Sequence, residues 1–281
     1  MQVGRPSRTA WAAAAHRAAH QVLEQGRIFA DPLALRILSE DTATITRWAE
    51  EQSTGRRMRI FIAARTRYAE DTLAAAVARG VGQVVVLGAG LDTYAYRTTL
   101  GDRLRIFEVD HPATQAWKRQ RLAEAAIPVP ASLTFAPVDF ERESLAEGLA
   151  AAGFDPRQRT FFTWLGVVPY LAEEAARRTL GFIAGLPHGA HVVFDYSDPP
   201  ASLPPEWRTA HARRAARVAA IGEPWVYYLE RGMLRDMLMA LGFSEIEDLG
   251  PKQIATLYFP SLANSLPDKG GHIVHAATTH A

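Results

Sequence analysis

The spacing of apolar residues changes near residue 80. From about residue 9 to residue 80, apolar positions recur at helical intervals among Ala, Leu, Arg and Glu, with breaks at Gly26, at Asp31-Pro32 and near Gly55. Beyond residue 80, short continuous apolar runs appear, beginning with QVVVLGAG and RLRIFEVD. Such runs suit strands that are covered on both faces. The pattern therefore predicts a helical front followed by a sheet.

Further strand and helix patterns then alternate along the chain. The predicted strands are LTFAPVDF, RTFFTWLGVVPY, HVVFDY, FSEIEDL and GHIVHAAT, and helices are expected after Pro112, at 145–151 and at 173–186. Alternation at these spacings predicts an α/β protein with a doubly wound parallel sheet.

The alternation is interrupted after Tyr196. A Pro-rich stretch, SDPPASLPPEW, precedes an Arg-rich helix pattern, TAHARRAARVAA. Insertions of this length usually have a role, and covering a substrate is a common one. We therefore predict one domain over 1–281: a helical cap (1–80), a cofactor-binding core (81–196), a lid segment (197–230) and a closing helix and strands (231–281).

Composition excludes several function classes. The 281 residues are 48% hydrophobic and 22% charged, which is typical of globular proteins. The net charge of +1 argues against a nucleic-acid partner, and the absence of cysteine excludes disulfides and thiolate metal sites. No apolar run approaches the roughly 20 residues of a membrane helix. We read no signal peptide at the start, so a cytoplasmic protein with a small-molecule partner is expected.

The segment VVVLGAGLDT carries the first functional signal. Gly88 and Gly90 follow the first predicted strand, at the edge where a doubly wound sheet opens its ligand crevice. A dinucleotide fingerprint requires a third glycine where this chain has Thr93, and Asp92 would repel a diphosphate. The loop therefore favours a cofactor that carries a positive charge.

Acidic residues follow the next two strands. Glu108 and Asp110 end the second strand, about 20 residues after the glycines, where an acid commonly binds ribose hydroxyls. Asp139 ends the third strand and is expected at an adenine amino group, with Phe140 lining the ring. The alternative is that Asp92, Glu108 and Asp139 cap the following helices.

At these residues the chain resembles the leucine carboxyl methyltransferase family, in its bacterial branch of S-adenosyl-L-methionine-dependent methyltransferases. The segments that carry the resemblance are RTRYAEDTLAAAVARGVGQVVVLGAGLDTYAYR, EVDHPATQAWKRQRL, PVDFERE, FFTWLGVVPYL, FADPLA and ALGFSEIEDLGP. The resemblance implies a Rossmann-like, seven-stranded class I methyltransferase sheet with additional N-terminal helices.

The resemblance also implies residue roles. Arg65 would pair with the methionine carboxylate of S-adenosylmethionine, and Gly88 and Gly90 would line the methionine end. Asp110, rather than Glu108, would hold the ribose. Asp139 and Phe140 would lie at the adenine. Eukaryotic members have a glutamate where this chain has Leu165, which argues against transferring their protein substrate.

The expected reaction is therefore methyl transfer to an oxygen of a small molecule. A carboxylate acceptor is already ionised at neutral pH and requires no general base, whereas a phenol or alcohol requires one. Tyr170 and Tyr196 follow the fourth and fifth strands and are candidates for the substrate pocket. Most of the lid arginines are expected on a solvated face, with one available to an acidic substrate: Arg208, Arg213, Arg214 and Arg217.

Two rival functions are a nicotinamide-dependent dehydrogenase and a non-catalytic protein that binds an adenosine cofactor. Thr93 and the absence of a Y-x-x-x-K motif argue against the dehydrogenase. His16 and His20 have the spacing of metal ligands on a helix, but no third ligand accompanies them, and no metal is expected. His272 and His275 are expected on opposite faces of the last strand, in structural roles.

Overall fold

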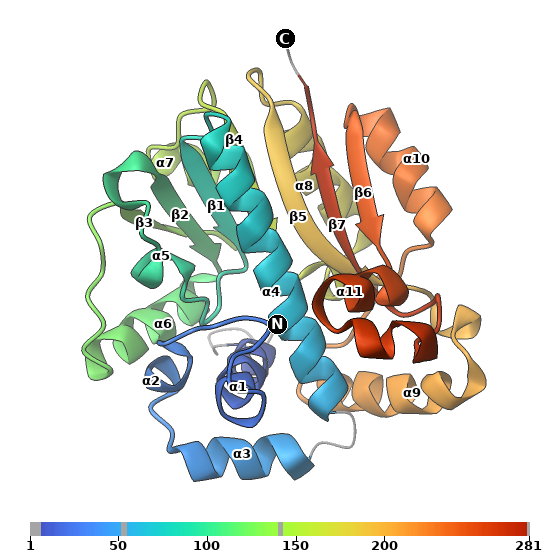
Figure 1. Cartoon of the computed structure of the whole chain (residues 1–281). Helices are drawn as coiled ribbons and strands as arrows, with labels where there is room; N and C mark the ends of the chain where they lie inside the picture. The colour runs from blue at the N-terminus through green and yellow to red at the C-terminus, as the bar shows by residue number, and fades with distance from the viewer. Residues whose placement is uncertain (1–6, 52–54, 140–142, 280–281) are drawn as a thin grey trace.

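A seven-stranded sheet forms the centre of the protein in this computed structural model, which describes residues 7–51, 55–139 and 143–279 (Figure 1). The strands are β1 (Gln83–Leu87), β2 (Arg105–Asp110), β3 (Leu133–Pro137), β4 (Thr160–Trp164), β5 (Ala190–Ser197), β6 (Glu245–Leu249) and β7 (Gly271–Ala277). The helices are α1 (Arg8–Leu23), α2 (Ala34–Leu38), α3 (Thr42–Glu51), α4 (Gly55–Ala78), α5 (Tyr94–Arg97), α6 (Pro112–Glu124), α7 (Leu145–Ala151), α8 (Glu173–Ala184), α9 (Pro205–Ala220), α10 (Arg231–Leu241) and α11 (Pro251–Tyr258).

The strand order is β3-β2-β1-β4-β5-β7-β6, and the first five strands are parallel. This confirms the predicted α/β class and the doubly wound sheet. Strand β7 runs antiparallel to both of its neighbours, a reversal that the apolar pattern did not indicate. The winding changes direction between β1 and β4, and in open α/β sheets ligands bind in the crevice at this point, beyond the carboxyl ends of the strands.

Each face of the sheet is covered by its own helices because side chains alternate along a strand. Val85 and Leu87 of β1 pack in one core with residues of α7, α8 and α10. Val84 and Val86 face the opposite way and pack with residues of α4, α5 and α11. Figure 1 shows α4 and α11 in front of the sheet and α8 behind it. Burial on both faces explains why β1 reads as a continuous apolar run.

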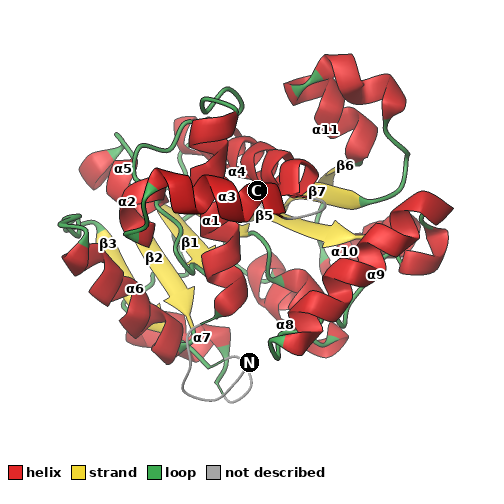
Figure 2. Cartoon of the chain, turned by 90° about the horizontal axis from the view of Figure 1, so that it is seen from below, coloured by secondary structure: helices red, strands yellow, loops and turns green. Residues whose placement is uncertain are grey.

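The N-terminal helices form a third core at the lower edge of the sheet. Alanines of α1 pack with residues of α2 and α3 and with Leu91. Leu91 belongs to the loop after β1 that contains Gly88 and Gly90, called the glycine loop below. Small alanine side chains on one face of α1 let these elements approach closely. Seen from below, α1 and α3 cross the carboxyl ends of the strands, and α9 lies beyond them on the side of β5 to β7 (Figure 2).

The lid segment contains the predicted Arg-rich helix, α9, which begins directly after Pro204. Its Trp207 ring lies 4.4 Å from the guanidinium carbon of Arg57, so α9 contacts the start of α4. Helix α11, which follows β6, was not predicted. Among the described residues, no helix has the length and apolarity to cross a membrane.

Candidate functional site

One large cavity lies at the carboxyl ends of the strands. Its volume is about 2120 Å³, roughly twice the upper end of the usual range for a small-molecule pocket. It is lined by the glycine loop, the ends of β2 and β5, and residues of α1, α4 and α9. The cavity therefore has room for a cofactor and a second ligand side by side.

Gly88 and Gly90 bring the backbone of the loop into this cavity. Their φ angles are +65° and +43°, in the left-handed region that glycine tolerates best. A Cβ on Gly88 would overlap the side chain of Val167, and one on Gly90 would lie 3.0 Å from Cβ of Ala10 in α1. Both positions therefore require glycine for conformation and for space.

The residue that replaces the third glycine of the dinucleotide fingerprint anchors the N-terminal helices. The Thr93 hydroxyl donates to Oδ2 of Asp31 over 2.6 Å, and Nε of Arg17 donates to the same oxygen over 2.8 Å. Arg17 also donates to the carbonyl oxygen of Leu91 over 2.5 Å. The front of the chain is thus attached directly to the glycine loop.

Asp110 is buried at the end of β2 and lines the cavity. Its Oδ2 accepts the backbone N–H of Gly90 over 2.6 Å, and its Oδ1 accepts the N–H of His111 over 2.7 Å. Burial raises the pKa of this carboxyl, and the two backbone hydrogen bonds oppose that rise. Each oxygen keeps a further lone pair with which it can accept a hydroxyl of a ligand.

Glu108 has a different environment, although it precedes Asp110 by only two residues. It is fully buried, lies 2.8 Å from Nζ of Lys118 and accepts the hydroxyl of Tyr96 over 3.1 Å. Burial raises the pKa of Glu108 to about 7, against the effect of Lys118. Glu108 does not line the large cavity, so the geometry favours Asp110 as the acid that meets a ligand.

The expected adenine end lies after β3. Asp139 is half-buried and lines the cavity, as does His111, whose ring caps α6 by accepting the N–H of Ala113. Phe140 lies outside the described residues. Asp110, His111 and Asp139 therefore share one wall of the cavity.

Arg65 of α4 lies at the centre of the site. Its Nη1 donates to Oδ2 of Asp195 over 2.8 Å, and the backbone N–H of Gly166 donates to the other oxygen over 2.5 Å. The pair is almost completely buried, and Nε of Arg65 has no hydrogen-bond partner. The guanidinium is therefore held in place and still has a donor for a ligand.

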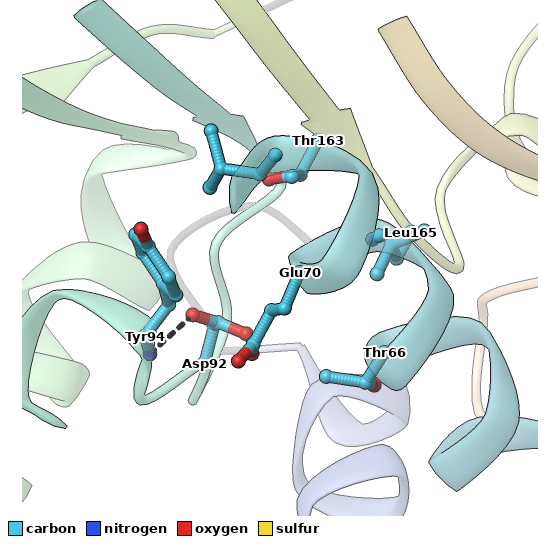
Figure 3. A pocket seen from close by; sticks show the side chains of 8 residues that line it. Thr66, Glu70, Asp92, Tyr94, Thr163 and Leu165 are labelled. Carbon is cyan, nitrogen blue, oxygen red and sulfur yellow. Dashed lines mark hydrogen bonds between the residues drawn. The ribbon is translucent and has the colours of Figure 1, made fainter. Parts of the chain in front are cut away.

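A second, much smaller cavity of about 20 Å³ lies beside the first, and Thr66, Asp92, Thr163 and Leu165 line both. Figure 3 shows the carboxylates of Glu70 and Asp92 close together at this cavity. Oδ1 of Asp92 accepts the N–H of Tyr94, the first residue of α5, whereas the N-cap position of this helix is Thr93, which makes no side-chain cap. The volume is sufficient for one water molecule.

Both tyrosine candidates line the large cavity, and the hydroxyl of Tyr196 is engaged outside it. The Tyr196 hydroxyl donates to Asp248 over 2.7 Å, and its ring stacks on His272. Burial raises the pKa of Tyr170, and hydrogen bonds with Trp225 and Thr9 oppose the rise. The two residues are better suited to form walls than to exchange protons.

The lid arginines separate into two groups. Arg213 is exposed and Arg208 donates to the carbonyl oxygen of Leu203, whereas Arg214 and Arg217 line the cavity. His211 lies on the same face of α9 as Arg214 and was missed by the sequence analysis. The signal that could have identified His211 is its i, i+3 spacing from Arg214, which places both side chains on one face of a helix.

Two acidic residues of the site were also missed. Asp195 is the second-to-last residue of the predicted strand HVVFDY, and an acid so near a strand end could have indicated it. Glu223 accepts hydrogen bonds from the backbone N–H groups of Arg8 and Thr9 and from the hydroxyl of Ser7. No local pattern signals this contact, which joins segments more than 200 residues apart. Among the described residues, no group of three or more His, Asp or Glu side chains is arranged to hold a metal ion.

Comparison with known proteins identifies the family of the chain. The profile of the family described as leucine carboxyl methyltransferase matches residues 10–184. A Bacillus subtilis (strain 168) protein, provisionally named S-adenosyl-L-methionine-dependent methyltransferase YktD, is 34% identical over 216 residues, covering 76% of this chain and 71% of its own. A Mycobacterium avium (strain 104) protein with the same provisional description is 32% identical over 215 residues, covering 74% and 68%.

Solved structures support the fold. A crystal structure of a provisionally named methyltransferase from Thermobifida fusca YX has a TM-score of 0.59 and 14% identity, covering 99% of this chain and 97% of that one. The carbon methyltransferase CurJ has a TM-score of 0.51 and 16% identity, covering 96% and 67%. The chain therefore belongs to the leucine carboxyl methyltransferase family and is an S-adenosyl-L-methionine-dependent methyltransferase.

Proposed function

We propose that this methyltransferase transfers the methyl group to a carboxylate oxygen of a small-molecule acceptor. The glycine loop, Asp110, Asp139 and Arg65 would hold the cofactor, and the part of the cavity beside α9 would hold the acceptor. The glycine-loop side is the wall formed by residues 88–92, Asp110 and Asp139, with Thr93 buried behind it. The α9 side is the wall formed by His16, α9 and the chain from Trp225 to Tyr228. We expect the protein to act in the cytoplasm.

The electrostatic environment of His16 is the observation that carries this proposal. Burial lowers the pKa of His16 to about 3, and four arginines add to this effect: Arg59, Arg214, Arg65 and Arg217. The His16 ring lines the cavity together with Arg214 and Arg217, and the coulombic effect of these guanidinium groups adds to the larger effect of burial on its pKa. Positive charge on this wall favours an anionic acceptor over a neutral one.

The residues of the site fit the cofactor. The loop glycines line the cavity, Asp110 has lone pairs for ribose hydroxyls, and the guanidinium of Arg65, which also lines the cavity, carries a charge that suits a carboxylate. When bound, S-adenosylmethionine supplies a methyl group on a sulfonium, so that an oxygen lone pair of the acceptor forms the C–O bond as the C–S pair leaves to sulfur.

The chain contributes orientation and charge rather than proton transfer. A carboxylate acceptor titrates near pH 4 and is ionised at pH 7, so no side chain has to remove a proton. Holding the acceptor oxygen in line with the methyl group can lower the barrier by roughly 7–11 kcal/mol. Tyr170 and Tyr196, which line the cavity, would form walls that restrict the orientation of the acceptor.

The test uses S-adenosylmethionine with a radiolabelled methyl group and a panel of aromatic and aliphatic acids, each paired with its amide, together with phenols. We expect label in acids but not in amides, and mild base should release it as methanol because esters hydrolyse. A base-stable product formed from phenols alone would replace the carboxylate by a hydroxyl acceptor. Cofactor binding without transfer to any compound would favour a non-catalytic binding protein.

A further inference from the structure

Two side chains of α9 that line the cavity each contain a nitrogen without a hydrogen-bond partner. His211 is 4% exposed, and its Nε2 is buried without a hydrogen bond; Nε of Arg214 is in the same situation. Both residues line the large cavity. Because buried polar groups in folded proteins nearly always have a partner, these nitrogens are polar groups that folding leaves unsatisfied beside the cavity.

Arg214 also differs from its neighbours in charge balance. Arg59 is paired with Glu24, and Arg65 is paired with Asp195. In the described part of the chain, no carboxylate lies within 4.0 Å of the Arg214 guanidinium. Burial lowers the pKa of Arg214, and the nearby guanidinium groups of Arg217 and Arg57 lower it further. An anion at this position would relieve both the desolvation and the repulsion.

Aromatic rings form the walls around these two residues. The His211 ring centroid lies 5.3 Å from that of Trp225 and 5.4 Å from that of Tyr228. The guanidinium carbon of Arg214 lies 5.8 Å from the Trp225 ring. A flat apolar group that carries an acidic substituent therefore matches these walls in shape and in charge.

The acidic group held here is unsuited to be the one that receives the methyl group. Negative charge on the reacting oxygen decreases as the C–O bond forms, so a guanidinium paired with that oxygen stabilises the reactant more than the transition state. Paired with a non-reacting acid, the same guanidinium positions the acceptor without slowing the chemistry. Figure 1 shows α9 below the ends of β5 and β7, away from β2, where Asp110 lies.

We propose that His211, Arg214 and Trp225 form a subsite for an acidic group of the acceptor other than the one that is methylated, so that the acceptor is an aromatic acid with two acidic groups. This inference rests on the proposed function, which supplies the methylation of the other acidic group. Helix α9 lies outside the part of the chain that the family profile matches. The inference therefore assigns the choice of acceptor to α9.

Binding is measured by calorimetry on the full chain saturated with S-adenosylhomocysteine, with terephthalate, its monomethyl ester and its dimethyl ester as probes. We expect the diacid and the monoester to bind at least tenfold more tightly than the diester, because only they retain an acid for Arg214. Arg214→Gln should remove this tenfold preference, and Arg214→Lys should retain part of it. Arg213→Gln is the matched control, since Arg213 is exposed on the same helix and should leave all three affinities unchanged.

Three results would overturn the inference: no binding of terephthalate to the unmodified protein at millimolar concentration, equal affinity for diacid and diester, or equal losses in the Arg214 and Arg213 variants. Turnover then separates the inference from the proposed function. Arg214-dependent binding without a base-labile product leaves the subsite standing and rejects the carboxylate acceptor. Ester formation from benzoate as efficient as from terephthalate supports the reaction and rejects the requirement for a second acid.

Discussion

The two sides of the cavity differ in whether their buried polar groups have hydrogen-bond partners. On the glycine-loop side, Asp110 accepts two backbone N–H groups, and Thr93 donates to Asp31. On the α9 side, His16, His211 and Arg214 each have a buried nitrogen without a partner. The cofactor is the same in every turnover, so it can be bound by rigid residues whose hydrogen bonds are already made within the protein. An acceptor that completes the hydrogen bonds of its own site is selected by its charge and shape.

A buried ion pair lies between the two sides and provides the largest expected effect. Asp195→Ala leaves the Arg65 guanidinium buried without its carboxylate, which should cost about 3–5 kcal/mol in the free energy of unfolding. Urea denaturation measures this loss. The double variant Asp195→Ala, Arg65→Met should recover much of it because no unpaired charge remains. A loss below about 1 kcal/mol in the single variant would show that the pair is not isolated from water.

The next effect separates the two acids of β2. Asp110→Asn should weaken binding of S-adenosylhomocysteine by roughly 10- to 150-fold, as expected for the loss of charge-assisted hydrogen bonds. Glu108→Gln is the matched control: it should lower stability through Lys118 and leave the affinity unchanged. Calorimetry measures the affinities. The opposite pattern would assign the ribose to Glu108 and reject the geometry described for the glycine-loop side.

The third prediction uses pH to examine the α9 side. The pKa of His16 is about 3 in the folded protein and near 6.5 when unfolded, so the unfolded state binds the proton first as pH falls. The stability associated with neutral His16 is present above pH 6.5 and is lost on acidification. Between pH 7 and pH 5, the parent protein should lose roughly 2 kcal/mol more than His16→Gln.

His272 provides the opposite case in the same molecule. Burial alone would lower its pKa, but hydrogen bonds to Asp198 and Asp248 outweigh burial and raise it. The contribution of His272 is therefore complete below its unfolded pKa and is lost as pH rises through the folded one. His272→Gln should reduce stability most at low pH. Equal pH profiles for the His16 and His272 variants would contradict the assigned environments.

The smallest effect concerns the contact between Glu223 and the start of α1. Glu223→Gln weakens the acceptor for the N–H groups of Arg8 and Thr9 at the start of α1 and should cost about 1 kcal/mol in stability. Thermal unfolding measures the change. Glu206→Gln, at an exposed position in the first turn of α9, serves as the control and should have a smaller effect, because Glu206 loses only a screened interaction with the helix dipole. A similar loss in both variants would indicate a general effect of charge.

Much of the glycine-loop side could be predicted because its signals are local. Parallel strands end at one edge of a sheet, so the glycines after β1 and the acids after β2 and β3 had to be neighbours there. The residues alone did not distinguish Glu108 from Asp110 as the acid that holds the ribose, because residues two apart point to the same face of a strand. Their environments differ because Lys118 and Tyr96 meet Glu108, while the backbone of the glycine loop meets Asp110.

The α9 side could be predicted only in outline. The Arg-rich helix was recognised, but nothing in its sequence distinguished Arg214, which lines the cavity, from Arg213, which is exposed. That difference depends on the rotation of α9 against α4, which the contact between Arg57 and Trp207 helps to fix. Helix α11 and the reversal of β7 were also not indicated by the apolar pattern.

The sequence by itself determined the α/β class, the glycine loop and the row of strand-end acids, because strand periodicity and glycine conformation act within a few residues. Only the tertiary structure decided which buried charges lie beside a partner of opposite charge and which do not. Arg65 meets Asp195 across 130 residues, whereas Arg214 meets no carboxylate in the described chain. Charge pairing depends on distances of a few ångströms between segments that are remote in sequence, and those distances exist only after the chain has folded.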